Sequence, residues 1–450
     1  MIKNLRTLTV ATIAIFALGA CEESQFPVAT GKGNLRGINA IITAPDVRFR
    51  IEESTNANGV SSLSFKDTHN FRYDNLSYNV NFETRLAEFE TDTRIATVNV
   101  DVVANTTYIL ALTGSIASPT VLQLEFDERQ WSGSETVFEG RALNLATTLG
   151  ELDVYFAAPG TVPVLGEAVA SIGYGEISAG FEPAAGDYEI TITTKDDPND
   201  VLYRSPTITQ GPATSVIYSV FDPDPSITGP VSVRVMGATG AGAELPDPAF
   251  PPGLRVMHAA LGTGNTDVYI DDDFTAPFVA DIAFGEVTSY VDFDTGATPV
   301  TLTPAGDTGV LLLEDTLTLF AGTLATMYLV GEPAELDIVA LQSNPRSIET
   351  AGRLRIVNLA ANSELFDIYI HGADELITDI VPSFADVPFR ANTGYLSRDA
   401  DSYEITITQA NETDVVAGPF TLDLSLGDVV ELAILDTADP NLFEIVEYGN

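Results

Sequence analysis

Residues 255–259 read Arg-Val-Met-His-Ala, and nine residues after the histidine, residues 267–270 read Asp-Val-Tyr-Ile. Short strands, separated by Gly, Pro, Asn and Asp, surround both segments, and this arrangement is typical of all-β sandwiches. The two segments recur together along the chain, so they mark a repeating unit rather than a single site. The sequence therefore predicts an all-β protein built from tandem copies of one domain.

Three further copies of the two segments define the spacing of the repeat. Within 355–370 they read Arg-Ile-Val-Asn-Leu and Asp-Ile-Tyr-Ile, and within 141–156 they read Arg-Ala-Leu-Asn-Leu and Asp-Val-Tyr-Phe. A fainter copy within 36–49 reads Arg-Gly-Ile-Asn-Ala and Asp-Val-Arg-Phe, with the Asp seven positions after the Asn in place of nine. Successive copies begin 105, 114 and 100 residues apart, a spacing typical of whole domains.

Later parts of the unit also recur. Tyr-Gly-Glu-Ile at 174–177, Phe-Gly-Glu-Val at 284–287 and Phe-Ala-Asp-Val at 384–387 are expected to occupy equivalent places. About seven strands in about 100 residues is the size of an immunoglobulin-like, antiparallel β-sandwich. We therefore expect four tandem sandwiches, each with its own core and able to fold alone, with the boundaries 35–125, 138–222, 253–342 and 352–450.

The joins between units indicate how the sandwiches are grouped. The stretch 237–253 is rich in Gly and Ala and ends in four prolines, so we expect it to be a linker and the main hinge. The first join, 126–139, carries the only tryptophan, Trp131, which is expected to seal that junction. These joins favour a string of four domains grouped as two pairs.

The repeated segments resemble the bacterial family of unknown function called the DUF4397 domain. Members of that family pair a His-Ala segment with Asp-Val-Tyr and a following Phe-Gly-x-Val. The resemblance is good over 253–342, fair over 352–450 and 138–222, and weak over 35–125. This chain has Ala260-Leu261 where the family commonly has Ser-Pro. The resemblance implies a β-sandwich fold and secretion, and no particular activity.

The N-terminus is expected to be a targeting signal rather than part of the folded domains. Lys3 and Arg6 precede an apolar run at 8–20 that is too short to span a bilayer, which predicts a signal peptide at 1–20. Leu-Gly-Ala-Cys at 18–21 resembles the bacterial lipoprotein signal, in which the cysteine is acylated after cleavage. We therefore expect Cys21, the only cysteine, to carry a lipid anchor, with 21–34 as its tether and Glu22 favouring the outer membrane.

Composition excludes several classes of protein. Asp and Glu number 64 against 21 Lys and Arg, a net charge of −43, so the chain repels nucleic acid. One cysteine and three histidines exclude a disulfide framework and a Cys/His zinc site. No Gly-x-Ser-x-Gly elbow or phosphate loop is present, so no catalytic residue is assigned and we expect a protein that is not an enzyme.

The recurring polar residues favour a structural interpretation, because every copy keeps them while the loops differ. His258 in particular has Asn at its equivalent positions, and Asn cannot accept a proton at neutral pH, so we expect a hydrogen-bonding role rather than a general base. The three series are Arg36, Arg141, Arg255 and Arg355; Asn39, Asn144, His258 and Asn358; and Asp46, Asp153, Asp267 and Asp367.

Acidic clusters between predicted strands are the remaining candidates for a site. Several carboxylates could together bind Ca²⁺, although Asp is also a common turn former and no cofactor is required. The candidate residues are Asp196, Asp197, Asp200, Asp222, Asp224, Asp271, Asp272 and Asp273.

These observations predict a non-enzymatic, lipid-anchored protein of the bacterial cell envelope that binds a ligand or acts as a spacer. Its expected partners are the outer membrane, through the lipid, and a glycan or an envelope protein. Two alternatives remain open. One is a surface adhesin stiffened by Ca²⁺, and the other is a hydrolase that uses a pair of carboxylates in one cleft.

Replacement of Cys21 by serine tests the anchor. Each buried CH₂ of an acyl chain contributes about 0.8 kcal/mol of membrane affinity, so loss of the thiol should move the protein from the outer-membrane fraction to the soluble fraction. Cell fractionation followed by immunoblotting measures this shift. An unchanged distribution of the Cys21→Ser protein would refute the lipid anchor.

Overall fold

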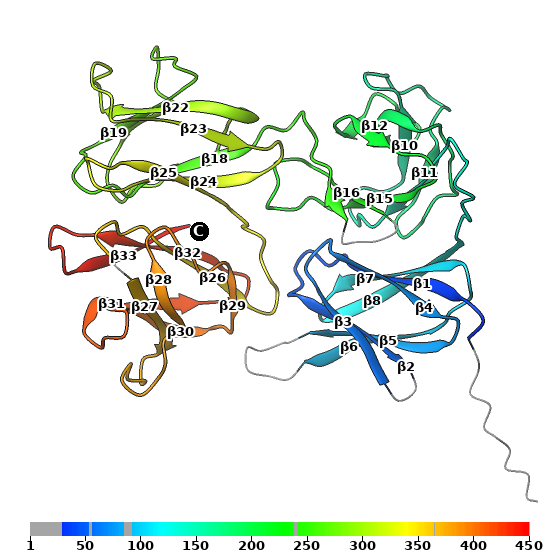
Figure 1. Cartoon of the computed structure of the whole chain (residues 1–450), viewed down its shortest axis with the longest axis horizontal. Coiled ribbons are helices and arrows are strands. Elements are labelled where there is room, and N and C mark those ends of the chain that lie inside the picture. The colour runs from blue at the N-terminus through cyan, green and yellow to red at the C-terminus, as the bar shows by residue number, and fades with distance from the viewer. Residues whose placement is uncertain (1–28, 54–55, 85–91, 238–241, 364, 450) are drawn as a thin grey trace, which may run out of the picture.

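The computed structural model describes residues 29–53, 56–84, 92–237, 242–363 and 365–449. The expected signal peptide and lipidation site Cys21 lie outside these residues. In the described part of the chain, thirty-three strands form eight sheets that pack in twos as four sandwiches (Figure 1). The same residues contain no helix with the length and hydrophobicity of a membrane span. The predicted all-β architecture of tandem sandwiches is confirmed.

The strands follow one another in four groups. The first sandwich contains β1 (Lys32–Asn39), β2 (Val47–Glu53), β3 (Asn56–Leu63), β4 (Thr68–Asp74), β5 (Ser77–Thr84), β6 (Thr93–Asp101), β7 (Thr106–Ser115) and β8 (Ser118–Asp127). The second contains β9 (Glu139–Asn144), β10 (Leu152–Ala157), β11 (Ala170–Ile172), β12 (Gly186–Thr194), β13 (Val201–Arg204), β14 (Ile208–Gln210), β15 (Ser215–Phe221), β16 (Ser232–Met236) and β17 (Ala243–Glu244).

The last two sandwiches contain eight strands each. The third contains β18 (Gly253–His258), β19 (Thr266–Ile270), β20 (Val279–Ile282), β21 (Val291–Asp292), β22 (Gly296–Pro304), β23 (Leu313–Leu319), β24 (Leu324–Val330) and β25 (Asp337–Gln342). The fourth contains β26 (Gly352–Asn358), β27 (Leu365–Gly372), β28 (Phe384–Pro388), β29 (Leu396–Arg398), β30 (Asp401–Gln409), β31 (Val415–Leu424), β32 (Val429–Asp436) and β33 (Phe443–Gly449).

Three of the four sandwiches share one topology. In the fourth sandwich the sheets have the orders β29-β26-β32-β33 and β28-β27-β30-β31, and the first and third sandwiches follow the same plan. The strands are not all antiparallel as expected, because the first strand of each unit runs parallel to the strand that closes it. These parallel pairs are β1/β7, β9/β15, β18/β24 and β26/β32. The chain crosses the other sheet between the two strands of each pair, and such a long crossover permits parallel pairing.

The second sandwich extends beyond the expected boundary at residue 222. β16 and β17 belong to its sheet, and the N–H of Leu245 donates to the carbonyl oxygen of Val233 (2.8 Å). Tyr203 also donates its hydroxyl to the carbonyl oxygen of Leu245 (2.8 Å). The described part of the expected linker at 237–253 is therefore held against this sandwich over residues 243–245 rather than free to act as a hinge.

The expected equivalence of residues 384–387 with 174–177 and 284–287 is wrong. In the third sandwich, His258 and the turn at 285–286 exchange two backbone hydrogen bonds. In the fourth sandwich, Asn358 exchanges the corresponding bonds with Arg390 and Ala391. Residues 384–387 instead lie in β28 at the edge of the opposite sheet. The similarity of Phe-Ala-Asp-Val to Phe-Gly-Glu-Val was therefore coincidental.

The first strand of each sandwich is buried on both of its faces. In β26, Leu354 and Ile356 point into the core of the fourth sandwich. The alternate residue Val357 points outward, into a second apolar cluster that includes Met257 and Tyr328 of the third sandwich. A corresponding cluster joins the first and second sandwiches through Ile38, Ile109, Leu143, Ile217 and other residues. Because residues alternate across a strand, both faces of the sheet carry buried apolar residues, and each sandwich needs a partner to cover the outward ones.

The four sandwiches therefore form two pairs, and the pairs also touch each other (Figure 1). The N–H of Thr228 in the second sandwich donates to the carbonyl oxygen of Gly322 in the third (3.0 Å). Arg346, in the join between the third and fourth sandwiches, donates to the carbonyl oxygens of Ile42 and Ala44 in the first (both 2.8 Å). The chain thus closes on itself instead of extending as a string.

The paired arrangement predicts that the pair, not the single sandwich, is the stable folding unit. A fragment of residues 253–342 would expose Met257, Ala259, Tyr328 and Val330, which the fourth sandwich otherwise covers. Exposure of this much apolar surface costs about 25 cal/mol per Å². A fragment of residues 253–449 should therefore unfold in urea at a clearly higher midpoint than the fragment 253–342. Equal midpoints would show that the shared cluster adds nothing to stability.

Candidate ligand-binding cleft

The recurring Asn or His ends the first strand of each sandwich and closes the turn that follows. The N–H of Ala260 donates to His258 Nδ1 (3.2 Å), and His258 Nε2 lies 2.9 Å from the carbonyl oxygen of Gly264. In the same way the N–H of Ala360 donates to the side-chain oxygen of Asn358 (3.1 Å). The corresponding bonds in the first two sandwiches are made by Asn39 and Asn144. The imidazole therefore takes the place of an amide that holds a turn.

The recurring Asp residues of the last three sandwiches hold neighbouring loops. The two carboxylate oxygens of Asp267 accept the N–H groups of Asp281 (2.7 Å) and Gly306 (2.8 Å). Asp367 likewise accepts two backbone N–H groups, and Asp153 accepts one N–H and one hydroxyl. All three are buried, and such charge-assisted bonds are roughly twice as strong as neutral ones.

Asp46 does not share this arrangement. It is exposed in front of β2 and accepts the hydroxyl of Ser64 (2.6 Å). In the register of the sheet, Arg48 stands opposite Glu83, whereas Asp153 stands opposite Thr193. Arg48 therefore occupies in the first sandwich the position that Asp153 occupies in the second, and Asp46 is not its equivalent.

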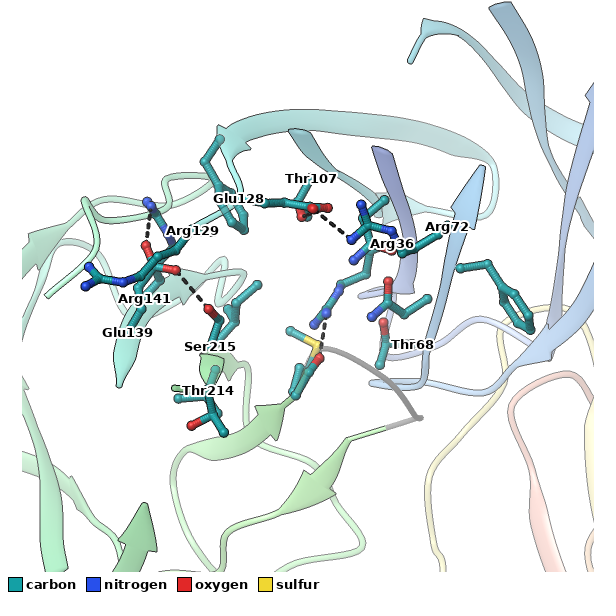
Figure 2. A pocket seen from close by; sticks show the side chains of 18 of the residues that line it. Arg36, Thr68, Arg72, Thr107, Glu128, Arg129, Glu139, Arg141, Thr214 and Ser215 are labelled. Atoms are coloured by element: carbon teal, nitrogen blue, oxygen red, sulfur yellow. Dashed lines mark hydrogen bonds and ion pairs between the residues drawn. The ribbon is translucent and has the colours of Figure 1, made fainter. Parts of the chain in front are cut away.

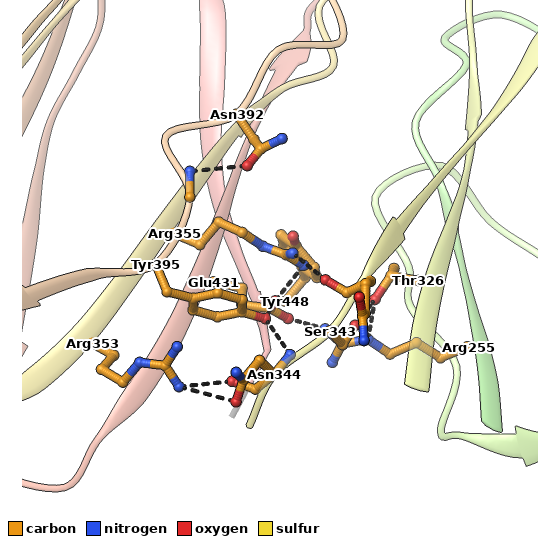
Figure 3. A network of polar contacts seen from close by, with 12 residues as sticks. Arg255, Thr326, Ser343, Asn344, Arg353, Arg355, Asn392, Tyr395, Glu431 and Tyr448 are labelled. Atoms are coloured by element: carbon orange, nitrogen blue, oxygen red, sulfur yellow. Dashed lines mark hydrogen bonds and ion pairs between the residues drawn. The ribbon is translucent and has the colours of Figure 1, made fainter. Parts of the chain in front are cut away.

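The recurring arginines lie on the outward face of each first strand, toward the neighbouring sandwich. In the second pair, Arg255 and Arg355 both form ion pairs with Glu431, which is 4% exposed (Figure 3). Tyr395 donates its hydroxyl to the same carboxylate, and Arg255 Nε donates to the hydroxyl of Thr326 (2.8 Å). The interface between the third and fourth sandwiches is thus closed around two cations and one anion.

The same interface in the first pair contains no counterpart of Glu431. Arg355 stands opposite Glu431 in its parallel strand pair, whereas Arg36 stands opposite Ile109 and Arg141 opposite Ile217. Arg141 instead pairs with Glu139 two residues earlier in β9 (2.8 Å). Arg36 forms no ion pair with any described residue.

In place of the closed network, the first pair has a cleft of about 1040 Å³ between its two sandwiches (Figure 2). One wall is formed by β1, β4, β7 and β8 of the first sandwich, and the other by β9, β15 and the loop before β15 in the second. Figure 2 shows Arg36 and Arg72 on the side of the first sandwich, opposite Arg129, Arg141 and Glu139. Clefts of this size are typical of ligand sites.

Arg36 is the exceptional residue of the cleft. It is 3% exposed, and its Nη2 donates to the carbonyl oxygen of Gly237 (2.6 Å), while Nε and Nη1 have no acceptor among the described residues. Burial lowers the pKa of the guanidinium from 12.5 to about 10, so the group remains charged at neutral pH. A buried cation without a counterion costs several kcal/mol, which indicates that its environment is incomplete.

Other side chains of the cleft combine aromatic surface with polar groups. Trp131 donates its indole N–H to Ser215 Oγ (3.2 Å), and the guanidinium of Arg129 lies over its ring at 4.3 Å. Phe71 is 57% exposed and stacks on His69, whose pKa is lowered by burial. Trp131 does lie at the junction of the two sandwiches, but beside an open cleft rather than a sealed contact.

The acidic candidates do not converge. Asp222 accepts the N–H and hydroxyl groups of Thr147 and Thr148, and these bonds outweigh burial and hold its pKa below the ordinary value. Asp224 forms an ion pair with Lys66 of the first sandwich (2.7 Å). The others form turns at separate places: Asp196, Asp197 and Asp200 between β12 and β13, and Asp271, Asp272 and Asp273 after β19. In the described part of the chain, no three His, Cys, Asp or Glu side chains are placed to hold a metal ion.

Sequence reasoning assigned Arg36 to the fold and did not identify Arg72, Arg129, Phe71 or the cleft itself. One signal was available in the aligned closing strands. Glu431 interrupts the apolar strand of the fourth unit, while Ile109 and Ile217 stand at that position in the first and second units. The first pair keeps the outward arginines Arg36 and Arg141 but lacks a carboxylate at this position in both units, and this pair contains the cleft.

The fold and these sites define the chain as a protein of tandem β-sandwiches. Residues 252–369, about a quarter of the chain, match the model of the domain of unknown function DUF4397. The match covers the whole third sandwich and continues into β27 of the fourth. This result supports the resemblance for that region.

No curated protein matches the chain significantly. Among solved structures, similarity is found to CBMbc (family CBM26) of Eubacterium rectale Amy13K in complex with maltoheptaose, with 13% identity over 44% of this chain and 97% of that one. The Bacillus anthracis TIE protein is 11% identical over 88% and 69%, and the glycogen-degrading pneumococcal virulence factor SpuA is 8% identical over 86% and 38%. All three have a TM-score of 0.16, so they carry no weight for function.

His258 allows a pH test of the turn-closing role. Burial lowers its pKa below 6.5, and Nδ1 must stay unprotonated to accept the N–H of Ala260. Below about pH 6.5 the unfolded chain binds a proton that the folded chain does not, so stability falls as the pH decreases toward the lowered folded pKa. His258→Asn should change the free energy of unfolding by less than about 1 kcal/mol at neutral pH and remove this part of the acid-side loss.

Urea unfolding of both proteins from about pH 7.5 to about pH 5 measures the effect. His69 and His371 are present in both proteins and contribute an equal background. Parallel pH profiles for wild type and His258→Asn would contradict the assigned role.

Proposed function

We propose that the protein is a non-enzymatic, lipid-anchored component of the bacterial cell envelope that binds a ligand in the cleft between its first two sandwiches. The observation that carries the proposal is Arg36, a buried cation that lines a cleft of about 1040 Å³ and has no anionic partner among the described residues. A ligand would complete this environment. The anchor rests on Cys21 and the sequence before it.

The charges of the cleft favour binding over catalysis. Asp67, Glu128 and Glu139 line it, and each forms an ion pair with an arginine: Arg234, Arg72 and Arg141 respectively. A general base needs a carboxylate or imidazole that is free to take a proton from a substrate. Carboxylates held in ion pairs are poor candidates for this task, which argues against the hydrolase alternative.

A spacer role is the second candidate, and the contacts between the pairs favour it. Because the two pairs contact each other through Thr228, Gly322 and Arg346, the four sandwiches form a compact block that could carry a site at a fixed height above the membrane. The spacer and binding roles are compatible, but only the binding role requires the cleft to stay open.

Obstruction of the cleft separates these roles. Thr214 is exposed on the cleft wall, so Thr214→Trp should fill part of the volume without disturbing a core. Thr275→Trp, in an exposed loop of the third sandwich, is the matched control. In a binding screen of envelope glycans and proteins, we expect Thr214→Trp to weaken the bound component at least tenfold and Thr275→Trp to leave it unchanged. Binding that is insensitive to Thr214→Trp, or no binding at all, would contradict the cleft as the site.

A further inference from the structure

We propose that the cleft recognises an acidic saccharide, a sugar chain that carries carboxylates, and that Arg36 binds the carboxylate. This inference rests on the proposed binding function and names the chemical class of the ligand. It is carried by three features of the cleft: the missing counterion of Arg36, the unpaired polar atoms beside it, and the aromatic surface at its rim.

The second pair of sandwiches shows what the outward arginine requires. There the carboxylate of Glu431 lies between two buried arginines at the interface and binds both. In the first pair, Ile109 occupies the corresponding position opposite Arg36. Two guanidinium nitrogens of Arg36 are left without acceptors in the described part of the chain. A carboxylate of a ligand would bind Arg36 as the carboxylate of Glu431 binds the arginines of the second pair.

The unpaired atoms beside Arg36 indicate more than a simple anion. Asn34 Oδ1 and Thr68 Oγ1 are buried in the wall of the same cleft and have no hydrogen-bond partner among the described residues. An amide oxygen accepts only, so it needs a donor, which an ionised carboxylate alone does not offer. A uronic acid carries hydroxyl groups on the same ring as its carboxylate, so one sugar residue could satisfy both kinds of group.

The aromatic residues fit the same ligand. Phe71 presents more than half of its surface to solvent, and Trp131 also lines the cleft. Ligand sites commonly combine such aromatic surface with a few polar groups that fix orientation. An acidic peptide is the competing ligand, but its carboxylates stand at the ends of flexible side chains away from its N–H donors.

The local charge allows an acidic ligand to approach in spite of the net charge of −43. Four arginines line this cleft, Arg36, Arg72, Arg129 and Arg141, and three carboxylates, Asp67, Glu128 and Glu139, so the lining carries a net charge of 4 − 3 = +1 in a strongly acidic chain. Repulsion from distant carboxylates is largely screened beyond about 8 Å at physiological ionic strength.

Calorimetry with the full-length protein in detergent tests the inference. The probes are tetragalacturonate, the neutral maltotetraose, inorganic phosphate and tetraglutamate. We expect tetragalacturonate alone to bind, with an affinity that falls as salt is added. Arg36→Gln should weaken it at least tenfold, about 1.4 kcal/mol. Arg204→Gln, which removes an arginine of the second sandwich outside the cleft, should leave the affinity unchanged.

Ile109→Glu provides a second, independent variant. It places in the first sandwich the carboxylate that the fourth carries at Glu431, so it should pair with Arg36 and abolish binding of tetragalacturonate. Ile109 is buried, and circular dichroism must show that the variant folds. Should it fail to fold, Arg36→Gln alone decides.

The other outcomes separate this inference from the proposed function. Equal binding of maltotetraose, or binding of tetragalacturonate that Arg36→Gln leaves intact, would overturn the role of Arg36 while leaving the cleft as a binding site. Binding of tetraglutamate without tetragalacturonate would overturn the saccharide class. If no probe binds but the binding screen finds an envelope component whose binding Thr214→Trp weakens, only the ligand class is wrong. If no probe binds and the screen finds no such component, the proposed function is wrong as well.

Discussion

The structure depends on the fact that the first strand of every sandwich is buried on both faces. One face closes the core of its own unit, and the other must be covered by a second unit. Pairing of sandwiches follows from this requirement, and so does the burial of the arginine that every copy carries on the outward face. A buried guanidinium needs an anion, so the question for each pair is where that anion comes from.

The two pairs differ in the anion that is available to these arginines. The second pair places Glu431 between Arg255 and Arg355 and closes the interface with Tyr328, Tyr395 and Tyr448 around it. In the first pair, Glu139 forms an ion pair with Arg141 but not with Arg36, and Arg36 lines a cleft. One interface thus supplies a carboxylate to both of its outward arginines, and the other leaves Arg36 without one among the described residues. The strand position that holds Glu431 in the fourth sandwich holds Ile109 in the first.

The sequence predicted much of this architecture. The all-β fold followed from the repeated segments, and β18–β25 and β26–β33 span Gly253–Gln342 and Gly352–Gly449, close to the expected ranges. The equivalence of 384–387 failed because short apolar-acidic motifs recur in β-proteins by chance, whereas the true copy at Arg390 is recognisable only by its hydrogen bonds. The cleft could not be predicted because it forms between units more than 100 residues apart in the sequence, whose relative placement no local pattern encodes.

Arg36 and Arg255 occupy the same place in the two pairs, but only Arg255 has a counterion among the described residues. Arg36→Met and Arg255→Met are matched substitutions that test this difference, and hydrogen exchange at β7 and β24 reports the stability of each pair separately. In the ligand-free protein, Arg255→Met should destabilise the second pair by about 3 kcal/mol, because it removes one cation of a buried ion network. Arg36→Met should leave the stability of the first pair unchanged or raise it. An equal loss for both variants would show that Arg36 already has an anionic partner in the ligand-free protein, which would contradict an open site at Arg36.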